Sequence, residues 1–117
     1  MTDDVSTMTH EVESRGDALV VTPHGRIGET EAHQFERELL SHIERGSVKL
    51  VLDLSDVSFV TSTALGALMV AHKRVKARQG YVRIVHPQPL VRQILEITKL
   101  VKLFGIYQSV DSAIAGR

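Results

Sequence analysis

The chain reads VTSTALG at residues 60–66, and this stretch decides the fold. It follows the apolar run LVLDL at residues 50–54, which is typical of a buried β-strand. It leads into residues 65–79, where apolar side chains recur at helical spacing. Three hydroxyl side chains therefore stand where a strand gives way to a helix. Such hydroxyls are favoured as helix caps, and the partial positive charge of a helix start also suits a phosphate group.

Strands and helices alternate outward from this stretch. The pattern predicts strands at residues 11–15, 18–24, 48–54, 81–85 and 106–107, and helices at residues 29–44, at 65–79, from Pro89 onward, and after a cap at Asp111. The helix that begins near Pro89 is expected to bury Leu90, Ile94, Leu95 and Ile97. We therefore expect an α/β fold in which a central mixed sheet of about four to five strands is covered by about four helices.

The length of 117 residues suits a single domain. Residues 1–9 are polar and acidic, and they are expected to form a flexible N-terminal tail before a domain at residues 10–117. Lysine and arginine total 14 and so do aspartate and glutamate, so the balanced charge argues against nucleic acid or an anionic membrane as a partner. Without cysteine, a signal peptide or a membrane-spanning apolar run, the protein is expected in the cytoplasm.

The residues that catalysis or metal binding needs are not found at the usual spacings. No two of the six histidines are four apart on one predicted helix, so we expect no metal site, no cofactor and no catalytic residue. His33 and His42 are expected on the surface, and His72 is expected in the core with a hydrogen-bond partner. Ser62 lacks the flanking glycines of a hydrolase nucleophile. The protein is therefore predicted not to be an enzyme.

The sequence DLSDVSFVTSTALG at residues 53–66 resembles the signature of the STAS domain. It is most similar to the single-domain bacterial anti-sigma factor antagonists, whose signature reads Asp-Leu-Ser, a short spacer, and then Asp-Ser-Ser-Gly-Leu-Gly. The likeness extends from about Asp17 to the C-terminus and includes GRI at residues 25–27 and FGIY at 104–107. The resemblance implies the STAS fold and a regulatory binding function.

The resemblance also implies a set of site residues and partners. Ser62 matches the serine that a partner kinase phosphorylates, with Thr63 as the alternative acceptor. The unphosphorylated protein would bind an anti-sigma factor that is also a serine kinase, phosphorylation would release it, and a serine phosphatase would restore binding. The predicted partner-binding footprint contains Arg26, Gly28, Glu29, Ser58, Thr61, Ser62, Thr63 and Gly66. Phe59 is either an exposed anchor or, as we favour, a core plug beneath the turn.

Three positions differ from the family pattern. Thr61 stands where the family has aspartate before the phosphoacceptor, Ala64 where it has glycine, and Gly28 where an acidic residue is common. The first difference removes a negative charge beside Ser62. The alternative interpretation is therefore a scaffold or adaptor module of a signalling or transport complex that uses the same STAS domain without cycling through phosphorylation.

Overall fold

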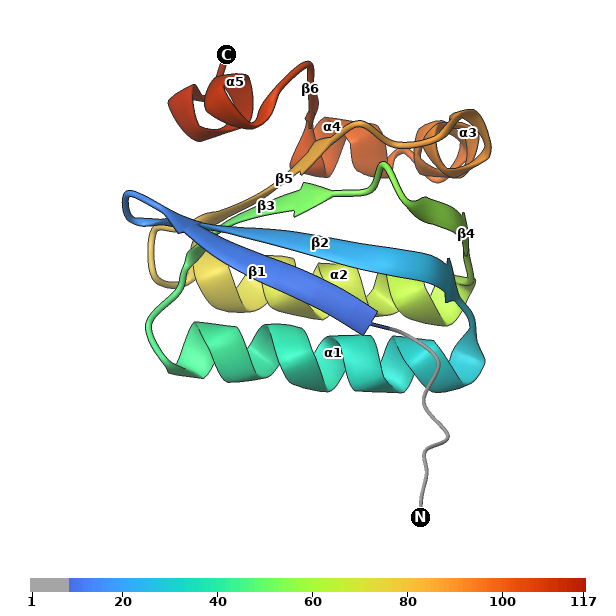
Figure 1. Ribbon diagram of the computed structural model, residues 1–117, viewed down its shortest axis with the longest axis horizontal. Coiled ribbons are helices and arrows are strands. Elements are labelled where there is room, and N and C mark those ends of the chain that lie inside the picture. The colour runs from blue at the N-terminus through green and yellow to red at the C-terminus, as the bar shows by residue number, and fades with distance from the viewer. Residues whose placement is uncertain (1–8) are drawn as a thin grey trace.

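The computed structural model describes residues 9–117. The expected tail lies outside these residues except for Thr9, which begins the first strand. In chain order the elements are β1 (Thr9–Arg15), β2 (Ala18–Ile27), α1 (Glu29–Glu44), β3 (Lys49–Asp53), β4 (Val57–Val60), α2 (Ser62–Lys76), β5 (Tyr81–Val85), α3 (Pro89–Ile97), α4 (Leu100–Phe104), β6 (Ile106–Tyr107) and α5 (Val110–Ala115). The predicted α/β fold with a mixed sheet is confirmed (Figure 1).

The sheet has the strand order β1-β2-β3-β5-β6, with β4 attached separately to β2. β1 and β2 form an antiparallel hairpin, and the other strand pairs are parallel. Helices connect most of the parallel strands, as such crossovers require. The mixed character of the sheet therefore comes from a single hairpin at its N-terminal edge.

The long strand β2 has two successive parallel partners. Its first part pairs with β3, where Leu19 lies opposite Leu50, and its last part pairs with β4, where Ile27 lies opposite Val60. The register shifts after Gly25, whose φ of +91° is a conformation that glycine adopts without strain. This irregularity lets one strand continue beyond the end of β3 and reach the segment that precedes α2.

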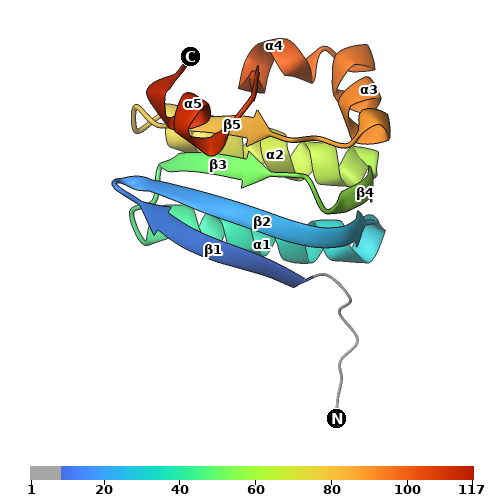
Figure 2. The ribbon, with the colours of Figure 1, turned by 45° about the horizontal axis from the view of Figure 1, so that its top comes forward.

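Helices cover both faces of the sheet (Figure 2), and buried apolar side chains form a cluster on each face. α1 and α2 cover one face, and the apolar stripe predicted for α1, which includes Phe35 and Leu39, is buried there. On the opposite face Val20, Val51 and Val85 pack against Ala113 of the short helix α5. The sheet thus has the large core beneath two long helices and a smaller core beneath the C-terminus.

Two expectations for the C-terminal third are wrong. α3 buries Val91 and Leu95, which are four residues apart and therefore lie on the same face of the helix. Leu90 is 49% exposed and Ile97 is 71% exposed, because both lie off that buried face. Ser109, and not Asp111, caps α5. The Ser109 Oγ accepts a hydrogen bond from the backbone N–H of Ser112 at 3.0 Å.

None of the helices in residues 9–117 combines the length and the apolar character that a membrane span requires.

Gly80 provides a test of the packing between the turn that joins α2 to β5 and Val48, the residue before β3. A Cβ atom at this position would lie 1.9 Å from the carbonyl oxygen of Val48, which belongs to the backbone and cannot turn away. We expect Gly80→Ala to lower the free energy of unfolding by about 1–3 kcal/mol, the usual cost of overpacking. Gly66→Ala is the matched control, because no atom lies within 4 Å of its Cβ position. Urea denaturation measures both, and wild-type stability of Gly80→Ala would contradict this packing.

Candidate functional site

The two long helices begin side by side at one end of the sheet (Figure 1). α1 follows β2 and α2 follows β4, and these two strands are paired with each other. The backbone N–H of Thr61 donates to the carbonyl oxygen of Ile27 at 3.1 Å, which joins the residue before α2 to the last residue of β2. Two helix starts, each with unpaired N–H groups and a partial positive charge, therefore share one surface.

Thr61 is the residue that caps α2. Its Oγ1 accepts a hydrogen bond from the backbone N–H of Ala64 at 3.2 Å, and the hydroxyl also lies 3.4 Å from the carbonyl oxygen of Ile27. The helix begins at Ser62, three residues before the predicted start at Leu65. The hydroxyl of Thr61 is therefore held by the fold.

Ser62 is the first residue of α2, and its side chain is exposed. Within residues 9–117 its hydroxyl has no hydrogen-bond partner. The first turn of α2 also contains no acidic residue. A group attached to the Ser62 oxygen would therefore extend into solvent beside the positive end of a helix.

Thr63 links the two helices. Its Oγ1 lies 2.8 Å from both Oε1 and Oε2 of Glu29, the first residue of α1, and donates its proton to that carboxylate. Thr63 is half-buried. This hydroxyl is therefore occupied, and a phosphate on it would meet the negative charge of Glu29.

Phe59 is not the core plug that was favoured for it, and its alternative role as an exposed anchor stays a prediction. The ring is half-buried, and the guanidinium of Arg26 stacks over it with its carbon 4.7 Å from the ring centroid. Val57 and Val60, at the two ends of β4, are buried in the core instead. Phe59 is thus part of a partly exposed surface pair that fixes the position of a cation near the start of α1.

The other residues of the predicted footprint lie on the same segments. Gly28 caps α1, and its backbone N–H donates to Oε1 of Glu31 at 3.1 Å. Ser58 is exposed on β4. Gly66 is exposed four residues after Ser62 and therefore lies on the same face of α2. The footprint residues thus come from the end of β2, the start of α1, β4 and the start of α2.

A histidine that the sequence analysis did not use fixes the turn before β4. His24 Nδ1 lies 2.6 Å from Oδ2 of Asp56, and its Nε2 lies 3.1 Å from Oε2 of Glu11. The hydrogen bond with Asp56, reinforced by Glu11, raises the pKa of His24 above its ordinary value of 6.5 despite some desolvation. Asp53 also stabilises this turn, since its Oδ1 accepts a hydrogen bond from the backbone N–H of Ser55 at 3.0 Å.

The expectations for two other histidines are wrong. His42 is half-buried rather than on the surface, because β1 packs over this side of α1. His72 contacts the ring of Phe104 edge-on, but its buried Nδ1 has no hydrogen-bond partner among the described residues. Burial lowers the pKa of His72, so its neutral form is favoured.

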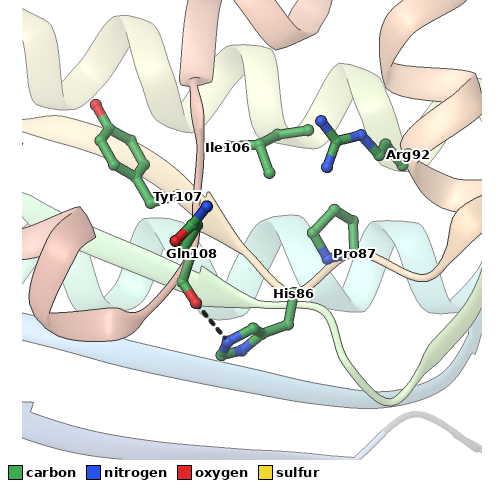
Figure 3. A pocket seen from close by; sticks show the side chains of 6 residues that line it. All are labelled: His86, Pro87, Arg92, Ile106, Tyr107 and Gln108. Carbon is green, nitrogen blue, oxygen red and sulfur yellow. Dashed lines mark hydrogen bonds between the residues drawn. The ribbon is translucent and has the colours of Figure 1, made fainter. Parts of the chain in front are cut away.

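A shallow pocket lies elsewhere on the protein, between the end of β5, β6 and α3 (Figure 3). Its volume is about 340 Å³, and it is lined by His86, Pro87, Arg92, Ile106, Tyr107 and Gln108. A ring nitrogen of His86, Nε2, lies 3.1 Å from the carbonyl oxygen of Gln108 across its floor. This pocket shares no residue with the predicted footprint around Ser62.

Comparisons with known proteins identify the family. The STAS domain profile matches residues 9–113, and the chain therefore belongs to the STAS domain family. A candidate anti-sigma factor antagonist of Bordetella bronchiseptica, BtrV, is 27% identical over 97 residues, which cover 83% of this chain and 84% of BtrV. The crystal structure of an anti-sigma factor antagonist from Mycobacterium paratuberculosis superposes with a TM-score of 0.83 at 27% identity and covers 94% of this chain and 93% of its own.

The fold is also that of SpoIIAA, another anti-sigma factor antagonist. Its unphosphorylated form superposes with a TM-score of 0.79 at 15% identity, covering 93% of this chain and 98% of its own. The phosphorylated form of the Bacillus protein superposes with a TM-score of 0.71 at the same identity and covers 93% of this chain and 100% of its own. The fold is thus shared with a protein solved in both phosphorylation states.

Because Thr61 and not Ser62 caps α2, substitutions at these two neighbouring residues should change the free energy of unfolding by different amounts. Thr61→Ala removes the cap of α2 and is expected to lower the free energy of unfolding by about 1 kcal/mol. Ser62→Ala removes a hydroxyl without a partner in residues 9–117 and is expected to change stability by less than about 0.5 kcal/mol. Chemical denaturation of both variants is the measurement. A larger loss for Ser62→Ala would show that Ser62 is the cap, as the sequence alone had allowed.

The contacts of His24 predict a pH dependence of stability. Because its pKa is raised in the folded state, protonated His24 stabilises the fold below about pH 6.5. This contribution is lost as the pH rises through the folded-state pKa. The difference in unfolding free energy between wild type and His24→Gln should therefore shrink with rising pH over this interval. His33→Gln, at an exposed position on α1, is the control. An NMR titration that places the pKa of His24 at or below 6.5 would contradict the assignment.

Proposed function

We propose that the protein is an anti-sigma factor antagonist that acts in the cytoplasm through the surface around Ser62. In the unphosphorylated state it binds and sequesters an anti-sigma factor that is also a serine kinase. Phosphorylation of Ser62 by this partner releases the complex, and a serine phosphatase restores the binding form. The protein itself catalyses no reaction in this cycle.

The observation that carries the proposal is the unequal use of three adjacent hydroxyls. Thr61 caps α2 and Thr63 donates to Glu29, whereas the hydroxyl of Ser62 is exposed and unengaged within residues 9–117. A kinase needs an acceptor oxygen that can enter its active site without breaking the substrate's own hydrogen bonds. Ser62 meets this requirement and also occupies the position that the resemblance assigns to the phosphoacceptor.

The electrostatics of the helix start support a switch that leaves the fold intact. A phosphoserine carries about −1.5 to −2 charges near neutral pH. In the free protein those charges face the N–H groups of α2, whose first turn has no acidic residue. In a complex the same charges lose water or meet a surface fitted to a neutral serine, which is costly. A loss of about 1.4 kcal/mol weakens binding tenfold, so a cost of a few kcal/mol from one phosphate would separate the partners.

The second candidate function is the scaffold or adaptor that binds a partner without phosphorylation. Thr61 favours it, because the family's aspartate beside the acceptor is replaced here by a neutral capping residue. The surface would be the same in both cases. The two functions therefore differ in one measurable property, which is whether Ser62 carries phosphate in the cell.

The first test locates the phosphate. The protein is incubated with ATP and with the kinase recovered alongside it from its native cells, and the product is mapped by mass spectrometry. We expect modification of Ser62 in the wild type and none in Ser62→Ala. Thr63→Val is the matched control, because it removes the neighbouring hydroxyl and should leave Ser62 modified. Phosphate that persists in Ser62→Ala would overturn the assignment, and an unmodified wild type would favour the scaffold.

The second test concerns the surface rather than the phosphate. Gly66→Ala should raise stability by up to about 1 kcal/mol, because alanine is the better helix former and its Cβ meets no atom within 4 Å. The added methyl group stands on the face of α2 that carries Ser62, so we expect the partner's affinity to fall. Titration calorimetry measures the affinity, and Gln79→Ala, at an exposed position after α2, is the control. Equal affinities would place the interface elsewhere.

A further inference from the structure

A cluster of three potential metal ligands lies between the edge strand and the first helix. His10 comes from β1, and Glu38 and His42 come from successive turns of α1. One ligand atom from each lies within 4.8 Å of the others. His10 Nε2 is 3.7 Å from Oε1 of Glu38, and the two imidazole rings meet edge to face with their centroids 5.9 Å apart.

His42 contributes a polar atom that the described fold does not satisfy. Its Nε2 is buried and has no hydrogen-bond partner within residues 9–117. Buried polar atoms nearly always have a partner, so an orphaned one calls for an explanation.

The geometry points to a zinc site formed by His10, Glu38 and His42. Two imidazoles and one carboxylate are a donor set that zinc accepts, with water completing a tetrahedron. Ligand atoms about 2.0–2.1 Å from zinc lie roughly 3.3 Å from one another. The three atoms here must therefore approach by at most about 1.5 Å, a distance that side-chain rotation can provide.

The sequence analysis missed this site because it searched only for pairs of histidines. The relevant spacing is between a glutamate and a histidine, since Glu38 and His42 are four residues apart and share one face of α1. The third ligand is distant in sequence and is brought close only by the packing of β1 over that face. The cluster is thus a product of the tertiary fold.

The site is separated from the surface around Ser62. Glu38 and His42 are 9 and 13 residues beyond Glu29 in the same helix, which places them about 14 and 20 Å from it along the axis. The ion would connect the edge strand of the hairpin to α1. Zinc is therefore expected to stabilise the domain without occupying the predicted partner footprint.

Titration calorimetry of chelator-treated, full-length protein with zinc chloride tests the proposal. We expect one zinc ion per chain and a rise of several degrees in Tm when zinc saturates the site. His42→Ala and Glu38→Gln should lose both effects. His33→Ala is the matched control, because it removes an exposed histidine from the same helix and should keep both. Cobalt in place of zinc should give the intense visible bands of a tetrahedral site.

Glu38→Gln is the variant least expected to disturb folding, because the Glu38 side chain is 40% exposed. Circular dichroism can confirm that it folds, so a loss of zinc binding in this variant reports on the ligand itself. Three results would overturn the proposal. These are no binding by the wild type, binding of several ions that no substitution changes, and stoichiometric binding that survives in both His42→Ala and Glu38→Gln.

Discussion

The pairing of β2 with β4 is the interaction on which the candidate site depends. Two backbone hydrogen bonds frame it, from the N–H of Gly25 to the carbonyl oxygen of Asp56 at 2.8 Å and from the N–H of Thr61 to that of Ile27 at 3.1 Å. Each of these strands is followed at once by a long helix. The pairing therefore places two helix starts side by side, and with them the hydroxyls, the carboxylate of Glu29 and the cation of Arg26.

The arrangement makes one hydroxyl different from its neighbours through position alone. Threonine and serine hydroxyls have the same intrinsic chemistry. Here the hydroxyl of Thr61 caps α2, and the hydroxyl of Thr63 donates a hydrogen bond to Glu29 at the start of α1. The third is left to solvent by the turn of the helix. Under the proposed function, the choice of phosphoacceptor is thus made by the hydrogen bonds of the folded chain, and a kinase needs little side-chain recognition to find it.

The sequence predicted the elements whose periodicity is strong. The bounds of α1 and β5 were predicted correctly, because a regular apolar stripe identifies α1 and a short, largely alternating run of β-formers identifies β5. β4 was not predicted, since only two of its four residues are buried and its partner is a strand extension that local patterns do not reveal. The capping role of Thr61 depends on a helix start that propensities locate only to within a few residues. The bond from Thr63 to Glu29 joins positions 34 apart, which no local pattern encodes.

The shortness of β4 has a consequence for folding. Its four residues pair with β2 across an intervening chain that contains α1 and β3. Pairing positions so distant in sequence costs loop-closure entropy, and four residues provide few contacts to offset that cost. Chains that are still folding, or that have locally lost β4, therefore lack the shared helix starts. Under the proposed function, a partner that recognises this surface therefore binds only chains in which β4 is paired with β2.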